Sequence, residues 1–226
     1  MDDNYIGPLA GDRLTALIQE ASRLGSSVVV DCGGGCATIL NHRLVNYTPE
    51  LKLIGPVYPV LTNGDILPVL QALDTIPPRH VMVIQDTKGD AALLGDIIML
   101  AAKKKGVAGL LCTGKVRDIS DASRLGLPVW AAAVSPKAAS LGVPASMPDS
   151  VMVAKHTIAF GDWLFGDRDG LVHIPAKSAR LIIKAAAIKD KKERIYKARI
   201  HNGEELFVMM NVRGHLTAGE AIRVEF

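Results

Sequence analysis

The feature that most constrains this chain is a regular alternation of apolar runs and helical patterns between residues 80 and 133. Short buried strands that alternate with helices need crossover connections, which are nearly always right-handed. The alternation therefore predicts an α/β fold in which helices cover a parallel sheet. In chain order, the expected elements are a strand over His80–Gln85, a helix over Ala91–Lys105, a strand over Val107–Cys112, a helix over Ile119–Leu125 and a strand over Pro128–Ala133.

The segments on either side of this region predict further elements. Leu53–Leu61 is strand-like, but its Pro56 and Pro59 favour an edge or bulged strand over a central one. The other expected elements are a helix over Asp12–Leu24, a short buried strand over Ser27–Val30, a short helix over residues 65–76, a small β layer with hairpin turns over residues 135–174 and a long helix from Ala176 to about Ile200.

The organisation of the chain favours one domain over residues 1–226. Its 49% hydrophobic and 22% charged residues are typical of a globular protein, and no internal repeat or low-complexity linker divides it. Beyond Gly203 the tail carries an apolar run, Leu206–Met210. We expect residues 176–226 to form a helix and tail that pack on this subunit or at a subunit interface.

Charge and cysteine content exclude several classes of protein. The net charge of +3 is too small for the clustered basic surface of most nucleic-acid-binding proteins, so nucleic acid is not an expected partner. No apolar run approaches the roughly 18 residues that cross a bilayer, and Met1–Tyr5 lacks a basic leader, so we expect no membrane partner and a cytoplasmic location. The odd number of cysteines, 3, fits a reducing compartment.

Chemistry is expected where the parallel strands end, at Gln85–Leu94 and Cys112–Asp118. Gly95 and Asp96 open a helix, whose free N–H groups attract an anion such as a carboxylate. Arg117 offers a planar fork of donors, and the neighbouring Asp118 can hold a hard divalent cation such as Mg²⁺. This pattern indicates a site for an anionic oxoacid on a metal, although helix caps and a surface ion pair explain the same residues.

Two further acidic residues belong to the same pattern. Asp121 lies on the short helix that follows Asp118, and it, like Asp96, is placed to hold a water at the metal or to accept a proton. From Asp96, twenty residues lead to Arg117-Asp118, and two more lead to Asp121.

This spacing resembles the D-x20-R-D-x2-E/D signature of the class II pyruvate aldolases that act on 4-hydroxy-4-methyl-2-oxoglutarate and 4-carboxy-4-hydroxy-2-oxoadipate. The same superfamily contains the regulator of ribonuclease activity A. The resemblance covers about residues 50–175 and extends through collinear segments at Gly55, Gly64-Asp65, residues 91–96, residues 106–109, residues 126–129, residues 134–136, Gly161-Asp162 and Asp169-Gly170.

The resemblance implies an αββα sandwich similar to swivelling phosphohistidine domains, assembled as trimers or paired trimers with active sites between subunits. It implies a lyase that cleaves or forms the carbon–carbon bond of a 4-hydroxy-2-oxoacid through a pyruvate enolate, with oxaloacetate decarboxylation as a side activity. The backbone of Gly95-Asp96-Ile97-Ile98 and the side chain of Arg117 would bind the pyruvyl group, and Asp118 would bind Mg²⁺ or Mn²⁺, with Asp121 acting through water. Glu193 is a candidate for the acid that these aldolases take from a neighbouring subunit.

Two alternatives stay open at the level of sequence. A noncatalytic regulator that binds a ribonuclease would share the fold, and the unusual loop Asp31–Cys36 together with the tail beyond Gly203 favours a divergent substrate. In that loop, Cys32 and Cys36 lack the further ligands of a zinc site, so we interpret them as ordinary buried thiols. The three glycines between them predict a tight turn or a close approach of backbone to substrate.

Overall fold

A computed structural model of the chain describes residues 12–40, 43–142 and 147–210. The elements, in chain order, are α1 (Asp12–Ala21), α2 (Ser26–Cys32), β1 (Thr38–Ile39), β2 (Val45–Asn46), β3 (Leu53–Thr62), α3 (Leu67–Thr75), β4 (Val81–Asp86), β5 (Ala92–Leu94), α4 (Asp96–Lys104), β6 (Gly109–Val116), α5 (Ile119–Leu125), β7 (Val129–Val134), β8 (Ser150–Val153), β9 (His156–Ala159), β10 (Trp163–Gly166), β11 (Leu171–Ile174), α6 (Ala176–His201) and α7 (Leu206–Met209).

One large sheet runs in the order β1-β11-β10-β3-β4-β6-β7-β2, and β5 pairs with β6 beside this path. Strands β3, β4, β6 and β7 are parallel, as the sequence pattern predicts for β4, β6 and β7, whereas β1, β2, β10 and β11 pair antiparallel. Only residues 40–44 separate β1 from β2, although these strands lie at opposite ends of the strand order. A connection of this length spans at most about 20 Å. The sheet must therefore be curled, with β1 and β2 near each other.

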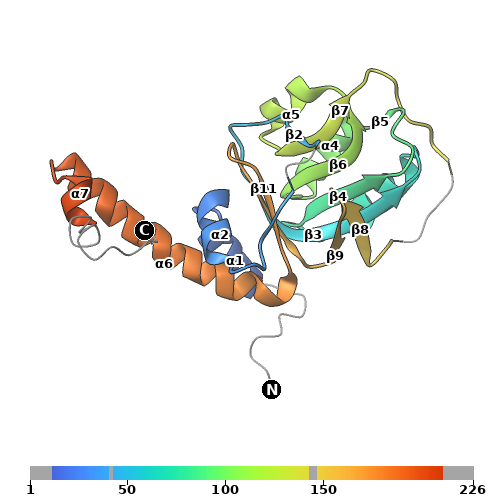
Figure 1. Cartoon of the computed structure of the whole chain (residues 1–226). Coiled ribbons are helices and arrows are strands. Elements are labelled where there is room, and N and C mark those ends of the chain that lie inside the picture. Colours follow the sequence, from blue (N-terminus) through green and yellow to red (C-terminus); the bar gives the residue numbers. More distant parts are fainter. Residues whose placement is uncertain (1–11, 41–42, 143–146, 211–226) are drawn as a thin grey trace.

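Three buried clusters show how the layers are stacked. One lies between the outer face of β3, β4, β6 and β7 and helices α3, α4 and α5. A second lies between β10, β11 and helices α1, α2 and α6, on the opposite side of the molecule (Figure 1). The third fills the inside of the curled sheet and is completed by the β8–β9 hairpin. The arrangement is the expected αββα sandwich.

Helix α6 begins against the sheet and then continues past it, so that its C-terminal half and α7 extend away from the body (Figure 1). Its buried residues all lie in the first half, and the last is Ala186. The apolar residues of α7, expected to pack, are exposed in this chain at Leu206, Phe207 and Val208. The rest of the tail, residues 211–226, lies outside the described residues.

The predicted strand at Ser27–Val30 is wrong, because these residues belong to helix α2. Val28 and Val29 are buried against α6 and β11. The helix is held at its first residue by Asp167, whose carboxylate accepts hydrogen bonds from Ser26 N at 2.7 Å and Ser26 Oγ at 2.6 Å. Tertiary packing therefore overrides the strand propensity of the valines.

The edge or bulged strand predicted at Leu53–Leu61 is wrong in its place in the strand order, because β3 lies between β10 and β4. The strand changes partner half way: Leu53–Pro56 pairs antiparallel with β10, and Val57–Thr62 pairs parallel with β4. Each half of β3 thus pairs with a strand on one side only. The other side needs no N–H donors, so the strand tolerates Pro56 and Pro59.

The helix expected over Ala91–Lys105 divides into two elements. Its first turn is the short strand β5, which pairs parallel with β6, and helix α4 begins only at Asp96. Helices α5 and α6 and strands β4, β6 and β7 lie within a few residues of their predicted positions. No helix in the described ranges is long and apolar enough to cross a membrane.

Candidate functional site

The candidate site forms where β5 and β6 end side by side. Leu94 is paired with Val116, and Arg117 N donates a hydrogen bond to Leu94 O at 2.9 Å. The next residue on each strand therefore lies at the same edge of the sheet. On β5 this residue is Gly95, the N-cap of helix α4, and on β6 it is Arg117, followed by Asp118.

The carboxylate of Asp118 joins the two strand ends. Its Oδ2 accepts a hydrogen bond from Asp96 N at 3.2 Å and lies 3.3 Å from Arg117 Nε. Within the described residues Oδ1 has no hydrogen-bond partner. The side chains of Arg117 and Asp118 are 39% and 37% exposed, so a ligand can reach both.

Gly95 is required here for space. A Cβ at this position would lie 2.9 Å from both Arg117 Nε and Asp118 Oδ2, closer than side-chain carbons come to such atoms. Its φ of −135° is open to any residue, so the constraint is contact and not backbone conformation. The missing side chain lets the Arg117–Asp118 pair sit directly on the N-terminus of α4.

Asp118 itself has an uncommon backbone conformation, with φ 56° and ψ 39° in the left-handed region. Aspartate tolerates this region better than most residues, and the chain then turns directly into α5, where Asp121 N donates to Asp118 O at 3.0 Å. Strained residues of this kind are concentrated at ligand-binding sites. The turn directs the Asp118 side chain back toward α4.

The other predicted site residues are placed differently. Asp121 lies on the first turn of α5, but its carboxylate is paired with Arg124 at 3.0 Å. The side chain of Ile97 is 76% exposed, whereas Ile98 packs on the core under α4. Glu193 is on α6, which contacts α1 and α2, and it pairs with Lys197 at 3.7 Å. Within one chain the structure therefore brings together Gly95, Asp96, Arg117 and Asp118, and leaves Glu193 on the other side of the molecule.

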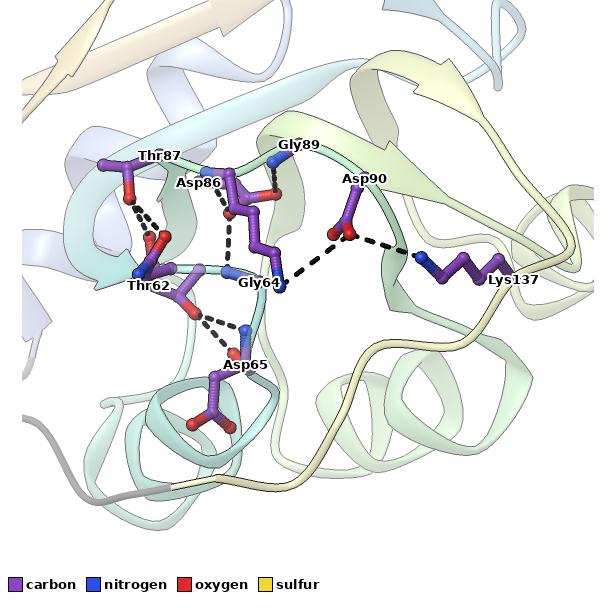
Figure 2. Close-up of polar contacts among 10 residues, drawn as sticks. Thr62, Gly64, Asp65, Asp86, Thr87, Gly89, Asp90 and Lys137 are labelled. Atoms are coloured by element: carbon purple, nitrogen blue, oxygen red, sulfur yellow. Dashed lines mark hydrogen bonds and ion pairs between the residues drawn. The ribbon is translucent and has the colours of Figure 1, made fainter.

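A polar network that the sequence reasoning missed is centred on Asp86, at the end of β4 (Figure 2). Asp86 Oδ1 accepts hydrogen bonds from Gly64 N at 2.9 Å and Lys88 N at 3.1 Å, and Oδ2 accepts one from Gly89 N at 2.8 Å. One carboxylate thus fixes the loops that follow both β3 and β4. The signal in the sequence is an aspartate at a strand end with glycines in both adjoining loops.

The same network shapes the approach to β5. Gly114 on β6 makes room for Asp86, because a Cβ there would lie 2.6 Å from Asp86 Oδ2. Further along the loop, Asp90 lies 3.2 Å from Lys137 Nζ and 3.8 Å from Lys88 Nζ, and its hydrogen bond with Lys137 lowers its pKa (Figure 2). Ala92 N then donates to Lys137 O at 2.7 Å. These contacts fix the path of the chain toward Gly95.

The residues of the candidate site fit a hard divalent cation held by few protein ligands. Asp118 offers an exposed carboxylate oxygen, and the described part of the chain contains no group of three or more His, Cys, Asp or Glu side chains suited to a metal. Mg²⁺ binds through one or two carboxylates and completes its shell with water and substrate oxygens. A single exposed carboxylate such as that of Asp118 is within the number of protein ligands that this ion uses.

Comparison with curated proteins finds relatives along most of the chain. A protein of Halalkalibacterium halodurans named "Putative 4-hydroxy-4-methyl-2-oxoglutarate aldolase" is 28% identical over 191 residues, which is 80% of this chain and 88% of that protein. A protein of the same name from Alkalilimnicola ehrlichii is 33% identical over 137 residues, 59% of this chain and 84% of that protein.

Solved structures confirm the fold. An uncharacterized protein from Pseudomonas syringae superposes with a TM-score of 0.73 at 20% identity, over 89% of this chain and 94% of that one. The RNA-processing inhibitor RraA from Thermus thermophilis superposes with a TM-score of 0.60 at 22% identity, over 65% of this chain and 92% of that one. The sequence profile of the RraA-like family, described as Aldolase/RraA, matches residues 15–173. The chain therefore belongs to the RraA-like family.

Proposed function

We propose that this protein is a divalent-metal-dependent lyase that cleaves, or in reverse forms, the carbon–carbon bond of a 4-hydroxy-2-oxoacid, with pyruvate as one product. The observation that carries the proposal is the convergence of Arg117, Asp118 and the N-terminus of α4 over Gly95. This arrangement puts a cationic fork, a carboxylate and free backbone N–H groups within reach of one small anion.

The chain supplies groups for both ends of a pyruvyl unit. The first N–H groups of α4, from Asp96 to Ile98, have no helical partner. That of Asp96 donates to Asp118 Oδ2, which leaves those of Ile97 and Ile98 to donate to the substrate carboxylate. The exposed guanidinium of Arg117 can donate to carboxylate and keto oxygens together. Negative charge grows on the keto oxygen as the bond breaks, so donors placed there stabilise the transition state more than the substrate.

The acidic residues would hold the cation and move a proton. Asp118 is the proposed ligand for Mg²⁺ or Mn²⁺, and the ion supplies further positive charge to the enolate oxygen when it is bound. Asp96, exposed on the first turn of α4, is proposed to position a water that gives or takes the proton. Asp121 would assist through a second water. The same site would decarboxylate oxaloacetate, because loss of carbon dioxide leaves the same enolate.

The proposal includes a trimer or hexamer in which a neighbouring subunit completes the site. Glu193, our candidate for the neighbour's acid, lies on the half of α6 that extends beyond the body (Figure 1). Exposed apolar side chains line this helix at Leu181, Ile188 and Ile195. In solution, light scattering should give at least three subunits, and a fully active monomer would exclude a shared site.

A noncatalytic role is the second candidate, and it is favoured by the similarity in fold to the RNA-processing inhibitor RraA of Thermus thermophilis. In that case the surface around α4 would bind a ribonuclease and the protein would release no pyruvate.

The deciding experiment is a coupled assay for pyruvate, with lactate dehydrogenase and NADH, over a panel of 4-hydroxy-2-oxoacids and oxaloacetate in Mg²⁺ or Mn²⁺. We expect metal-dependent release from at least one substrate. Arg117→Lys should lose most of this activity, because lysine keeps the charge but not the planar fork. Arg168→Lys, an exposed arginine on the β10–β11 turn paired with Glu50, is the matched control. No pyruvate from any substrate would contradict the lyase and favour the noncatalytic role.

A further inference from the structure

Two of the three cysteines lie where the sequence did not place them. The expectation that Cys32 and Cys36 are buried is wrong: Cys32 is half-buried at the end of α2, and Cys36 is exposed. Cys112, in contrast, is fully buried in the core under α4 and α5. The predicted tight turn at the three glycines is confirmed, because Gly34 and Gly35 have φ values of 53° and 84°.

A tight turn connects the two thiol-bearing residues. Gly33 N donates to Val30 O at 3.0 Å, and Cys36 N donates to Gly33 O at 2.8 Å, which closes a β-turn over residues 33–36. A Cβ at Gly33 would lie 2.3 Å from the Ala37 Cβ, so the chain has reversed on itself by residue 37. In a β-turn the first and fourth Cα atoms, here those of Gly33 and Cys36, lie within about 7 Å. Cys32 directly precedes Gly33, so the two cysteines flank this turn.

The turn also has freedom to adjust. Among the described residues, no group other than the chain neighbours lies within 4 Å of the Cβ positions of Gly34 and Gly35. Glycine has the widest backbone freedom of any residue. Rotations within this segment can therefore change the separation of the two sulfur atoms.

We propose that Cys32 and Cys36 form a reversible intramolecular disulfide when the protein meets a peroxide. The inference concerns a site separate from Arg117 and Asp118, and it stands whether or not the protein is a lyase. Disulfides in reducing compartments are mostly transient ones of this kind.

The reaction balances in two steps. The Cys36 thiolate attacks one peroxide oxygen, the O–O bond breaks, and Cys36 becomes a sulfenic acid while hydroxide leaves and is protonated to water. The Cys32 sulfur then attacks the Cys36 sulfur, the S–S bond forms, the S–O bond breaks, and the departing hydroxide takes the Cys32 proton as water. Two thiols and one hydrogen peroxide thus give one disulfide and two waters.

The surroundings assign these roles to the two cysteines. Cys36 is the exposed thiol, so peroxide reaches it first. Burial raises the pKa of Cys32, although the ammonium of Lys189 opposes this effect. Lys189 is held nearby, with its Nζ 2.7 Å from Asp31 Oδ2, the residue before Cys32. Cys32 is therefore the protected thiol that resolves the sulfenic acid.

The test is oxidation of the full-length reduced protein with hydrogen peroxide, followed by alkylation in denaturant, trypsin digestion and mass spectrometry. The tryptic peptide of residues 24–43 contains both cysteines. We expect this peptide to escape alkylation and to be lighter by two hydrogen atoms, and dithiothreitol to reverse the change. Buried Cys112, whose pKa burial raises to about 12, is the internal control and should stay a thiol.

Variants and a folding control distinguish the proposal from its alternatives. In Cys32→Ser we expect the Cys36 sulfenic acid to be captured by dimedone, and in Cys36→Ser we expect Cys32 to stay reduced. The disulfide should form faster in native protein than in denaturant, because the turn holds the cysteines together. Double alkylation of the peptide, chiefly intermolecular dimers, or a disulfide that forms only in denaturant would overturn the proposal.

Discussion

Two carboxylates of this protein each hold the N-terminus of a helix, but they are paired to very different degrees. Asp162 is buried, and its two oxygens accept hydrogen bonds from Ala176 N, the first residue of α6, and Ala159 N, with His173 Nε2 2.8 Å from Oδ2. Asp118 is half-exposed at the start of α4, with one hydrogen bond and one ion pair on Oδ2 and no partner among the described residues on Oδ1.

The difference separates a carboxylate that stabilises the fold from one that can bind a ligand. Burial pushes the pKa of Asp162 upward, but the hydrogen bonds from His173, Ala159 and Ala176 outweigh it and leave the pKa below its ordinary value. Both of its oxygens are hydrogen-bonded inside the chain. Asp118 keeps acceptor capacity and solvent access, which are what a cation needs.

The largest effect is expected from Asp118→Ala. Removal of the proposed metal ligand should lower turnover by about 10²-fold or more, as does the loss of other groups that stabilise transition-state charge. The melting temperature should change little, because the side chain is half-exposed and only lightly bonded. Steady-state kinetics with Mg²⁺ and Mn²⁺ titrations, together with thermal melts, measure both quantities.

Two outcomes would contradict this distinction between Asp118 and Asp162. If Asp118→Ala stays folded with near wild-type turnover and unchanged metal dependence, then its free oxygen has no catalytic use and the site is assigned to the wrong residue. If it unfolds, Asp118 is a structural anchor like Asp162.

The sequence predicts the half of the molecule in which local pattern and tertiary structure agree. Alternating strands and helices after residue 80 fixed the parallel sheet, and the strand-end rule placed Arg117 and Asp118 at its edge. Helix α2 escaped prediction because buried valines are compatible with strand or helix, and the deciding contact comes from Asp167, far along the chain.

The candidate site was predicted in its residue types but not in its contacts. No periodicity reveals that Gly95 leaves space for Arg117 and Asp118, or that Asp86 ties two loops together. Such facts depend on which loops meet in space. Glu193 shows the same limit in another way, since the role proposed for it requires a second subunit.

The second effect in size is expected from Asp162→Asn. The amide keeps the shape of the side chain but replaces one acceptor oxygen with an NH₂ donor. That donor would face either Ala176 N or both Ala159 N and His173 Nε2. We expect a loss of about 2 kcal/mol of unfolding free energy, or roughly 4–8 °C in Tm. Denaturant titration and thermal melts measure it, with Asp169→Asn on the neighbouring exposed turn as control. Activity per folded molecule should be unchanged, and a specific loss of turnover would contradict a purely structural role.

A smaller effect is expected from Gly95→Ala, which tests whether the Arg117–Asp118 pair must rest on α4. The new Cβ would come within 2.9 Å of both partners and push them outward. We expect kcat/KM to fall by about tenfold, since small displacements of positioning groups are costly. Gly25→Ala is the matched control, because its Cβ meets only ordinary contacts at 3.5 Å or more. Equal kinetics in the two variants would show that the pair tolerates displacement.

The smallest expected effect is a change in how stability depends on pH. A carboxylate whose pKa is lowered in the folded state adds stability that is full above the unfolded pKa, about 3.9 for aspartate, and is lost as pH falls through the lower folded value. Asparagine does not titrate, so the stability gap between wild type and Asp162→Asn should be largest near pH 7 and should narrow below about pH 4. Thermal melts of both proteins across this range measure the gap. A gap that stays constant would mean that the two acceptor oxygens of Asp162, and not its charge, hold the start of α6.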